Sequence, residues 1–196
     1  MLVAANQQGG KTTMVLEFIR RRHEVLNVDI RKIIYCYSEY QQAFDEVKDP
    51  IVEFTNSLVD LESKLEPYTV CIIDDHMAEI ESTHNSFVTA LFTKKIHHSK
   101  LGVILLLQNA YAKNIRTISL NCTFMALGAF VRDQSFITNI ARQIAPGNIR
   151  WVELAYKECM KKEYGFLFLD FGVRTPNKFR LRNSLFPDDM IIYVPV

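Results

Sequence analysis

Short apolar runs and longer amphipathic stretches alternate along the chain. A continuous apolar run of about four to eight residues is typical of a strand that is covered on both faces. The predicted strands are Leu2–Ala4, Lys32–Tyr37, Ile51–Phe54, Val70–Ile73, Leu101–Leu107, Phe124–Phe130, Phe166–Phe171, Lys178–Arg182 and Ile191–Val194. Stretches with apolar side chains at helical spacing predict the intervening helices. These are the segment after Thr12, the stretch near Ser57–Leu65, the stripe Phe87–Ile96, and the segments from about Asp133 to Ile144 and about Ile149 to Lys162. Repeated strand–helix–strand units predict an α/β three-layer sandwich with a mostly parallel central sheet.

The composition indicates one globular domain over residues 1–196. Hydrophobic residues make up 48% of the chain and charged residues 23%, and no linker or low-complexity stretch divides it. A formal net charge of +1 excludes a general attraction to DNA or membranes, so nucleic-acid contacts would need local basic patches. Such patches occur at Arg20–His23, Lys94–Lys100 and Arg174–Arg182. Solvated helix ends or loops are the ordinary alternative for each patch.

The cysteines and the apolar runs indicate a soluble, intracellular protein. The four cysteines lie far apart and form no C-x-x-C pair, which predicts reduced, buried thiols. The longest uninterrupted apolar run, Val103–Leu107, is too short to span a bilayer. No charged-then-apolar leader precedes the first predicted strand. We therefore expect no membrane segment.

A segment directly after the first predicted strand matches a phosphate-binding loop. The pattern G-x-x-x-x-G-K-[ST] is met at Gly10, Lys11 and Thr12, with Ala5 where the first glycine belongs. Such a loop needs a strand before it and a helix after it, because N–H groups at the helix N-terminus bind the anion. Lys11 would neutralise the β- and γ-phosphates, and the Thr12 hydroxyl would ligate Mg²⁺. The residues expected to hold the nucleotide are Asn6, Gln7, Gln8, Gly9, Gly10, Lys11, Thr12 and Thr13.

Ala5 places one requirement on this interpretation. Its φ must be negative, because a left-handed conformation costs about 1 kcal/mol or more for any residue with a Cβ. The alternative is a turn that merely contains glycine.

Two aspartates follow the apolar run Val70–Ile73 directly. A carboxylate that leaves a buried strand is costly to keep charged unless a cation or hydrogen-bond donors meet it, so the pair indicates a metal site. Asp74 would belong to the Mg²⁺ shell, and Asp75 would orient or deprotonate the attacking water. The structural alternative is that Asp75 caps the next helix.

Polar residues after later runs extend the predicted site, because ligands of open α/β sheets bind beyond the carboxyl ends of the strands. Gln108 follows Leu101–Leu107 and would contact the γ-phosphate or its water, whereas Asn109 better fits a strand-ending turn. Phosphoryl transfer also needs positive charge at the leaving oxygens, often an arginine from a neighbouring subunit. The candidates are Arg116, Arg132 and Arg142. Spacing does not choose among them, and each could equally form a surface ion pair. His97 and His98 are expected at a solvated helix end that faces solvent or DNA.

Several segments taken together resemble the genome-packaging ATPases of double-stranded DNA viruses and of virus-like Maverick/Polinton elements, which are relatives of the HerA/FtsK DNA pumps. The segments are AxxxxGKTT, Val70–Asp75, KKIHHSKLGVILLLQN, IRTISLN, RDQSFITNIARQIAP, YGFLFLDF and KFRLRN. The resemblance covers nearly the whole chain. It implies a RecA-like ATPase core that uses ATP and Mg²⁺, assembles as a homo-oligomeric ring and drives double-stranded DNA into a capsid. By position it gives Lys11 and Thr12 the phosphate and Mg²⁺ roles, makes Asp74 and Asp75 the acidic pair, and makes Gln108 the sensor.

The resemblance also implies capsid or portal proteins as partners, and the host cytoplasm or nucleus at the site of virion assembly as the location. The sequence departs from the family pattern at two positions. Asp75 stands where many related motors carry glutamate, which is one methylene longer, and Ala5 replaces the usual glycine. The chain starts at the first predicted strand, so we expect a trimmed core.

Three other interpretations share part of this pattern. A nucleoside or nucleotide kinase would have the same loop and sheet, but it should also have an arginine-rich lid over two substrates. A GTP switch would need an N-K-x-D motif, and the segment Asn177–Arg180 fails at its last position. A structural protein with a degenerate nucleotide site would be consistent with Ala5.

Overall fold

The computed structural model of the chain describes residues 1–82, 87–95, 99–108, 115–131 and 135–195. These residues form two compact units that interleave along the sequence. The first unit is built from the described parts of residues 1–2, 27–107 and 111–122. The second is built from those of residues 3–26, 108–110 and 123–196.

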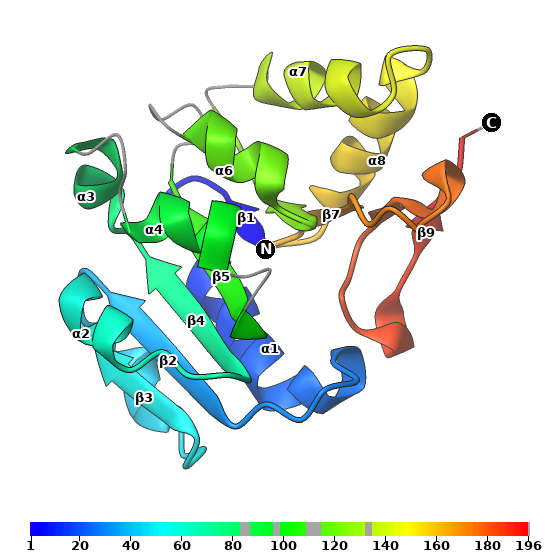
Figure 1. Cartoon of the computed structure of the whole chain (residues 1–196). Helices are drawn as coiled ribbons and strands as arrows, with labels where there is room; N and C mark the ends of the chain where they lie inside the picture. The colour runs from blue at the N-terminus through cyan, green and yellow to red at the C-terminus, as the bar shows by residue number, and fades with distance from the viewer. Residues whose placement is uncertain (83–86, 96–98, 109–114, 132–134, 196) are drawn as a thin grey trace. The chain divides into compact units, whose positions relative to one another are not determined.

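A parallel sheet forms the centre of the first unit (Figure 1). Its strand order is β3-β2-β4-β5, and β1, which begins in this unit, lies next to β5. The strands are β1 (Leu2–Ala4), β2 (Lys32–Tyr37), β3 (Val52–Thr55), β4 (Thr69–Asp74) and β5 (Gly102–Leu107). Paired positions advance together along β2, β3, β4 and β5, so these strands run in the same direction. Every residue of β4 is buried, as expected for a central parallel strand. The predicted parallel sheet is therefore confirmed.

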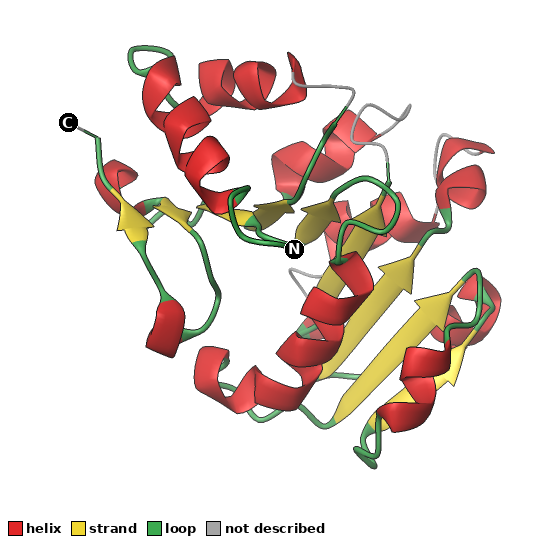
Figure 2. Ribbon diagram, turned by 180° about the vertical axis from the view of Figure 1, so that it is seen from behind, coloured by secondary structure: helices red, strands yellow, loops and turns green. Residues whose placement is uncertain are grey.

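The first unit also contains short helices, which follow its strands along the chain (Figure 2). They are η1 (Gln42–Glu46), α2 (Leu58–Ser63), α3 (Met77–Ser82), α4 (Phe87–Ala90), the π-helical η2 (Leu91–Lys95) and α6 (Ile115–Asn121). Ser57 starts α2, because its side chain accepts a hydrogen bond from the Asp60 N–H. Val88, Leu91 and Phe92 are buried, which confirms the predicted apolar stripe as far as residue 95.

Antiparallel strands and longer helices make up the second unit. The helices are α1 (Lys11–Val25), α7 (Ser135–Ile144) and α8 (Ile149–Cys159), with the short turns η3 (Asn177–Phe179) and η4 (Pro187–Asp189). The strands, in the order β1-β6-β7-β8-β9, include β6 (Phe124–Leu127), β7 (Leu167–Asp170), β8 (Leu181–Arg182) and β9 (Ile192–Tyr193). Helix α8 packs against α7 and against β7 and β8. None of the described helices is long and apolar enough to cross a membrane.

Two predicted elements end earlier than their apolar patterns suggest. Strand β6 ends at Leu127 rather than Phe130, because its pairing with β7 stops there and the Gly128 N–H turns to the Ala4 carbonyl. Helix α8 ends at Cys159 rather than Lys162. The Lys162 N–H donates to the carbonyl three residues earlier, which tightens and closes the last turn.

The predicted strand Lys178–Arg182 is wrong in its first half. Residues Asn177–Phe179 form a 3₁₀ turn, and only Leu181–Arg182 pair with β7. The turn forms in place of the predicted strand because two local hydrogen bonds stabilise it. The Pro176 carbonyl accepts from the Phe179 N–H, and the Asn177 side chain accepts from the Arg180 guanidinium. Polar side chains that bond to the nearby chain compete with a sheet ladder in this way.

The four cysteines, all among the described residues, are buried and form no disulfide, as the sequence predicts. Burial raises the pKa of Cys71 to about 12 and the pKa of Cys122 to about 11. Both thiols therefore stay protonated at neutral pH, and a protonated thiol is a poor nucleophile and metal ligand.

Candidate functional site

The phosphate loop leaves β1 and enters α1 within six residues, at positions 5–10. Positive φ angles occur at Gln8 (60°) and at Gly10 (77°), whereas Ala5 has no positive φ. The requirement that the sequence places on Ala5 is thus met. The tight turn is made later in the loop, where Gly10 takes the left-handed conformation that glycine adopts without steric cost.

Ala5 is completely buried, and glycines make room for its methyl group. A Cβ at Gly9 would lie 2.9 Å from the Ala5 Cβ and 2.8 Å from the Asn6 carbonyl oxygen. A Cβ at Gly128, directly after β6, would lie 2.7 Å from the Ala5 Cβ. The Gly128 N–H also donates to the Ala4 carbonyl at 2.9 Å. The extra methyl at the first loop position is therefore matched by glycine at positions 9 and 128.

We expect Gly128→Ala to lower the free energy of unfolding by about 1–3 kcal/mol, the usual cost of overpacking. The cost should fall when Ala5→Gly is added, because the added methyl then occupies the space that the Ala5 methyl leaves. Chemical denaturation of both single variants and the double variant measures this coupling. Strictly additive effects would contradict the packing of Ala5 against Gly128.

Lys11 folds back over the loop. Its ammonium group donates to the carbonyl oxygens of Ala5 (2.8 Å) and Asn6 (2.9 Å). It is the first residue of α1, whose first turn contains no acidic side chain and whose start has no side-chain cap. A helix N-terminus carries partial positive charge and N–H groups without intrahelical partners. The loop, the lysine and the helix end together form a region suited to an anion.

Tyr164 is a neighbour of the loop whose contact the sequence did not predict, although it begins the segment YGFLFLDF that the resemblance includes. A Cβ at Gly10 would lie 2.8 Å from the Tyr164 Cβ, so this tyrosine packs directly on the turn. Tyr164 has a φ of 53° and an exposed side chain. No pattern in the sequence predicts this contact, because the position of Tyr164 depends on the turns after α8.

The acidic pair lies at the end of the buried strand β4, in the first unit. Asp74 is only 6% exposed, and the Tyr35 hydroxyl on β2 donates to its Oδ2 at 2.8 Å. Asp75 has a φ of 59°, which turns the chain away from the strand. The residue before α3 is His76, whose carbonyl accepts from the Ile80 N–H. His76 is therefore the residue directly before α3, and Asp75 lies one residue further from the helix.

His76 was not a candidate from the sequence. His76 is only 4% exposed. Its Nε2 atom lies 3.3 Å from the Cys36 sulfur. Both residues sit beside the strand end that carries Asp74, since Cys36 is on β2 and its register partner is Ile73. The contact thus pairs two buried side chains next to the end of β4.

The remaining candidates lie in several places. Gln108 follows β5 and is half-buried. Arg116 lies in α6 and is exposed, and Arg142 lies in α7, where its guanidinium donates to the Asn139 side chain at 3.2 Å. Four sequence candidates lie outside the described residues. These are His97, His98, Asn109 and Arg132.

The described residues include no cluster of three or more His, Cys, Asp or Glu side chains that could hold a metal by itself. The donors that the sequence assigns to Mg²⁺ are the Thr12 hydroxyl and the Asp74 carboxylate. Mg²⁺ prefers such hard oxygen ligands, and it usually binds through one or two protein ligands together with substrate phosphates and water. The chemistry of the donor set therefore fits Mg²⁺ carried by a nucleotide. Thr12 belongs to the second unit and Asp74 to the first.

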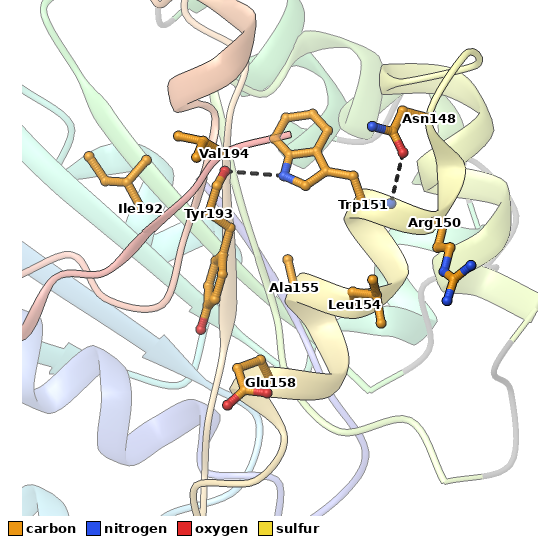
Figure 3. A pocket seen from close by; sticks show the side chains of 9 residues that line it. All are labelled: Asn148, Arg150, Trp151, Leu154, Ala155, Glu158, Ile192, Tyr193 and Val194. Atoms are coloured by element: carbon orange, nitrogen blue, oxygen red, sulfur yellow. Dashed lines mark hydrogen bonds between the residues drawn. The ribbon is translucent and has the colours of Figure 1, made fainter. Parts of the chain in front are cut away.

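A separate hollow of about 480 Å³ lies between α8 and the chain at β9 (Figure 3). Trp151 closes one side, and its indole N–H donates to the Tyr193 carbonyl at 3.2 Å. Leu154 and Ile192 line it with apolar surface. None of the candidate site residues lines this hollow, so it has no part in the nucleotide site that the sequence predicts.

Comparisons with known proteins place the fold. No family model matches the chain, and no curated protein matches it either. The chain is similar to the genome packaging NTPase B204 from Sulfolobus turreted icosahedral virus 2, in complex with ATP-gammaS. That match has 17% identity and a TM-score of 0.59, and it covers 100% of this chain and 96% of that chain. It is also similar to B204, the DNA-packaging ATPase from Sulfolobus turreted icosahedral virus, with 14% identity, a TM-score of 0.60, and coverage of 100% and 96%.

A further similarity is to the monomer form of the pCW3 conjugation coupling protein TcpA with ATPgS. Here the identity is 14% and the TM-score 0.51, and the match covers 88% of this chain and 57% of that chain. At such low sequence identities, the comparisons show the fold alone. The predicted RecA-like P-loop α/β fold is confirmed, and the chain has the fold of viral genome-packaging NTPases.

Proposed function

We propose that this chain is an ATP-hydrolysing motor that translocates double-stranded DNA and packages a viral or virus-like genome into a capsid. The observation that carries the proposal is the loop at positions 5–10. It leads into α1 with Lys11 folded over its carbonyl groups and with no acidic side chain in the first helical turn. Structures with the same fold are described as genome packaging NTPases, and one is in complex with ATP-gammaS.

In this proposal the loop residues from Asn6 to Thr13 bind the phosphates of ATP. Lys11 exchanges its bonds to the loop carbonyls for bonds to the β- and γ-phosphates. The Thr12 hydroxyl and the Asp74 carboxylate would hold Mg²⁺, which would supply positive charge at the phosphate oxygens.

Three further roles complete the proposed mechanism. Asp75, turned away from β4 by its positive φ, orients or deprotonates the attacking water. Gln108 contacts the γ-phosphate or that water. An arginine from the neighbouring subunit, Arg116 or Arg132, stabilises the leaving oxygens, and such a residue is worth about a thousandfold or more in rate. The motor would then act as a homo-oligomeric ring, with capsid or portal proteins as partners at the site of virion assembly.

The test is the rate of ATP hydrolysis with Mg²⁺, measured with and without duplex DNA over a series of protein concentrations. We expect the rate per chain to rise with concentration, as subunits complete one another's sites, and to rise again when duplex DNA is added. Transfer of phosphate to a nucleoside would favour a kinase instead. Absence of hydrolysis at every concentration would favour a structural protein with a degenerate site.

A further inference from the structure

A basic loop joins β7 to β8 in the second unit. We use the name basic loop for residues 171–180, Phe171–Arg180. This loop and the strand that follows it carry four basic residues and no acidic one. They are Arg174, Lys178, Arg180 and Arg182. Val173 at the tip is 99% exposed, so the loop stands out from the surface of its unit.

Asp170 holds the base of the basic loop. This buried carboxylate accepts the Gly172 N–H at 2.8 Å and the Thr175 hydroxyl at 3.1 Å, and it pairs with the Arg182 guanidinium. The Arg180 guanidinium donates to the Asp170 carbonyl at 2.7 Å. Two of the four basic residues, Arg180 and Arg182, therefore help to fix the shape of the loop. A loop fixed in this way loses little conformational entropy when it binds a partner.

The other two basic residues, Arg174 and Lys178, point their charge outward without an acidic partner. Both are exposed, and neither forms an ion pair with any residue that the structure describes. The Lys178 ammonium group lies over the ring of its neighbour Phe179, 4.9 Å from the ring centroid. Two exposed cations without counter-charges attract an anionic partner.

The basic patch Arg20–His23, which the structure describes in full, behaves differently. In Arg20–His23, Arg20 pairs with Glu17 and Arg21 pairs with Asp188 at 2.7 Å, while the Arg22 guanidinium donates to the Ile19 carbonyl. Carboxylates and a carbonyl group of the chain itself therefore already bind the three guanidinium groups of this patch. Of the two basic patches that the structure describes in full, the one at the basic loop is the one that leaves outward charge for a partner.

The basic loop and the phosphate loop lie at opposite ends of the strands that connect them. Gly128, after the carboxyl end of β6, bonds to Ala4 at the start of the phosphate loop. At the other end of β6, Phe124 pairs with Asp170 at the base of the basic loop. All of these residues belong to the second unit. A change in the outward side chains of the basic loop is therefore separated from the nucleotide site by the length of β6.

We propose that the basic loop contacts the phosphate backbone of double-stranded DNA, with Arg174 and Lys178 each neutralising one phosphate. The proposal rests on the proposed function, which supplies a duplex as the substrate. Arg and Lys carry most contacts to phosphate, and exposed amides such as the Asn177 side chain add hydrogen bonds to sugar and phosphate oxygens. The loop presents donors and apolar groups but no carboxylate, which suits a uniformly anionic partner. Contacts of this kind position the protein without reading sequence.

The test is a double variant, Arg174→Ala with Lys178→Ala, in the full chain. Binding to a fluorescently labelled duplex is measured by anisotropy over a series of KCl concentrations, without nucleotide. We expect affinity to fall at least about tenfold for every duplex sequence, and the slope of log affinity against log salt to fall by about 2, or about 1 for each lost phosphate contact. ATP hydrolysis without DNA should be unchanged, and its stimulation by duplex should be reduced.

Lys161→Ala with Lys162→Ala is the matched control. It removes two exposed charges from the same unit, but these lysines pair with Glu158 and Asp189. The control should keep the wild-type affinity and salt slope. Unchanged duplex binding in the double variant of the basic loop overturns the inference. The basic loop would then be a candidate site for an acidic protein partner. A wild-type chain that binds duplex normally but hydrolyses no ATP contradicts the proposed function instead, so the two failures can be told apart.

Discussion

Replacing Lys11 with alanine will lower the steady-state rate of ATP hydrolysis by about a hundredfold or more, the usual loss when one preorganised group is removed from the transition state of an enzyme. Lys11 carries a full charge, and its contacts with the Ala5 and Asn6 carbonyls place that charge over the loop. Alanine favours helix, so the first turn of α1 should form as before. Hydrolysis is measured with Mg²⁺ and ATP, and binding is measured separately with a fluorescent nucleotide.

The control is Lys161→Ala, which removes a lysine that is 72% exposed and paired with Glu158 on α8. Its hydrolysis rate should equal that of the wild type. Thermal unfolding of both variants shows whether either substitution changes stability. A hydrolysis rate in Lys11→Ala within threefold of the wild type would remove the main support for the proposed function.

The parallel part of the fold could be predicted because a strand that is buried on both faces appears in the sequence as a continuous apolar run. The runs that became β2, β4 and β5 are nearly all apolar, and a polar residue marks the end of each run. Asp74 stands at such an end, which is why it was found from the sequence. The roles of Lys11, Asp75 and Gln108 in catalysis stay predictions, since their partners would be a nucleotide and a second subunit.

The antiparallel strands could not be predicted in the same way. An apolar run records that a strand is buried but not the direction in which it runs, and β7, β8 and β9 pair antiparallel. The segment before Arg182 is short and mostly polar, so the local hydrogen bond from the Arg180 guanidinium to the Asn177 side chain decides its conformation.

Close packing between distant positions also leaves no sequence signal. Ala5 looks like a defect in the loop pattern when it is compared with a motif, yet its methyl group fits because residue 128 is glycine. The two positions are more than a hundred residues apart in the sequence, so only the folded chain shows that they touch. The contacts of Asp170 could not be predicted from the sequence either. A strand pattern marks this residue only as the polar end of an apolar run.

Replacing Asp74 with asparagine will also lower ATP hydrolysis by about a hundredfold or more, because a bound metal ion supplies several kcal/mol of charge stabilisation in the transition state. Asparagine keeps the size of the side chain and an oxygen that can accept from the Tyr35 hydroxyl, but it removes the negative charge that would hold Mg²⁺. The folded state should be as stable as the wild type or more so, because a buried carboxylate is costly to desolvate. Hydrolysis over a Mg²⁺ series and chemical denaturation measure the two effects.

Tyr35→Phe separates the charge of Asp74 from its hydrogen bond. This variant keeps the carboxylate but leaves it without the hydroxyl donor on β2, so we expect a loss of about 1–3 kcal/mol in the free energy of unfolding. Hydrolysis should remain much closer to the wild type than in Asp74→Asn, because the ligand itself is still charged. Loss of stability together with full activity in Asp74→Asn would assign this carboxylate to structure, and Mg²⁺ would then have to be held by other groups.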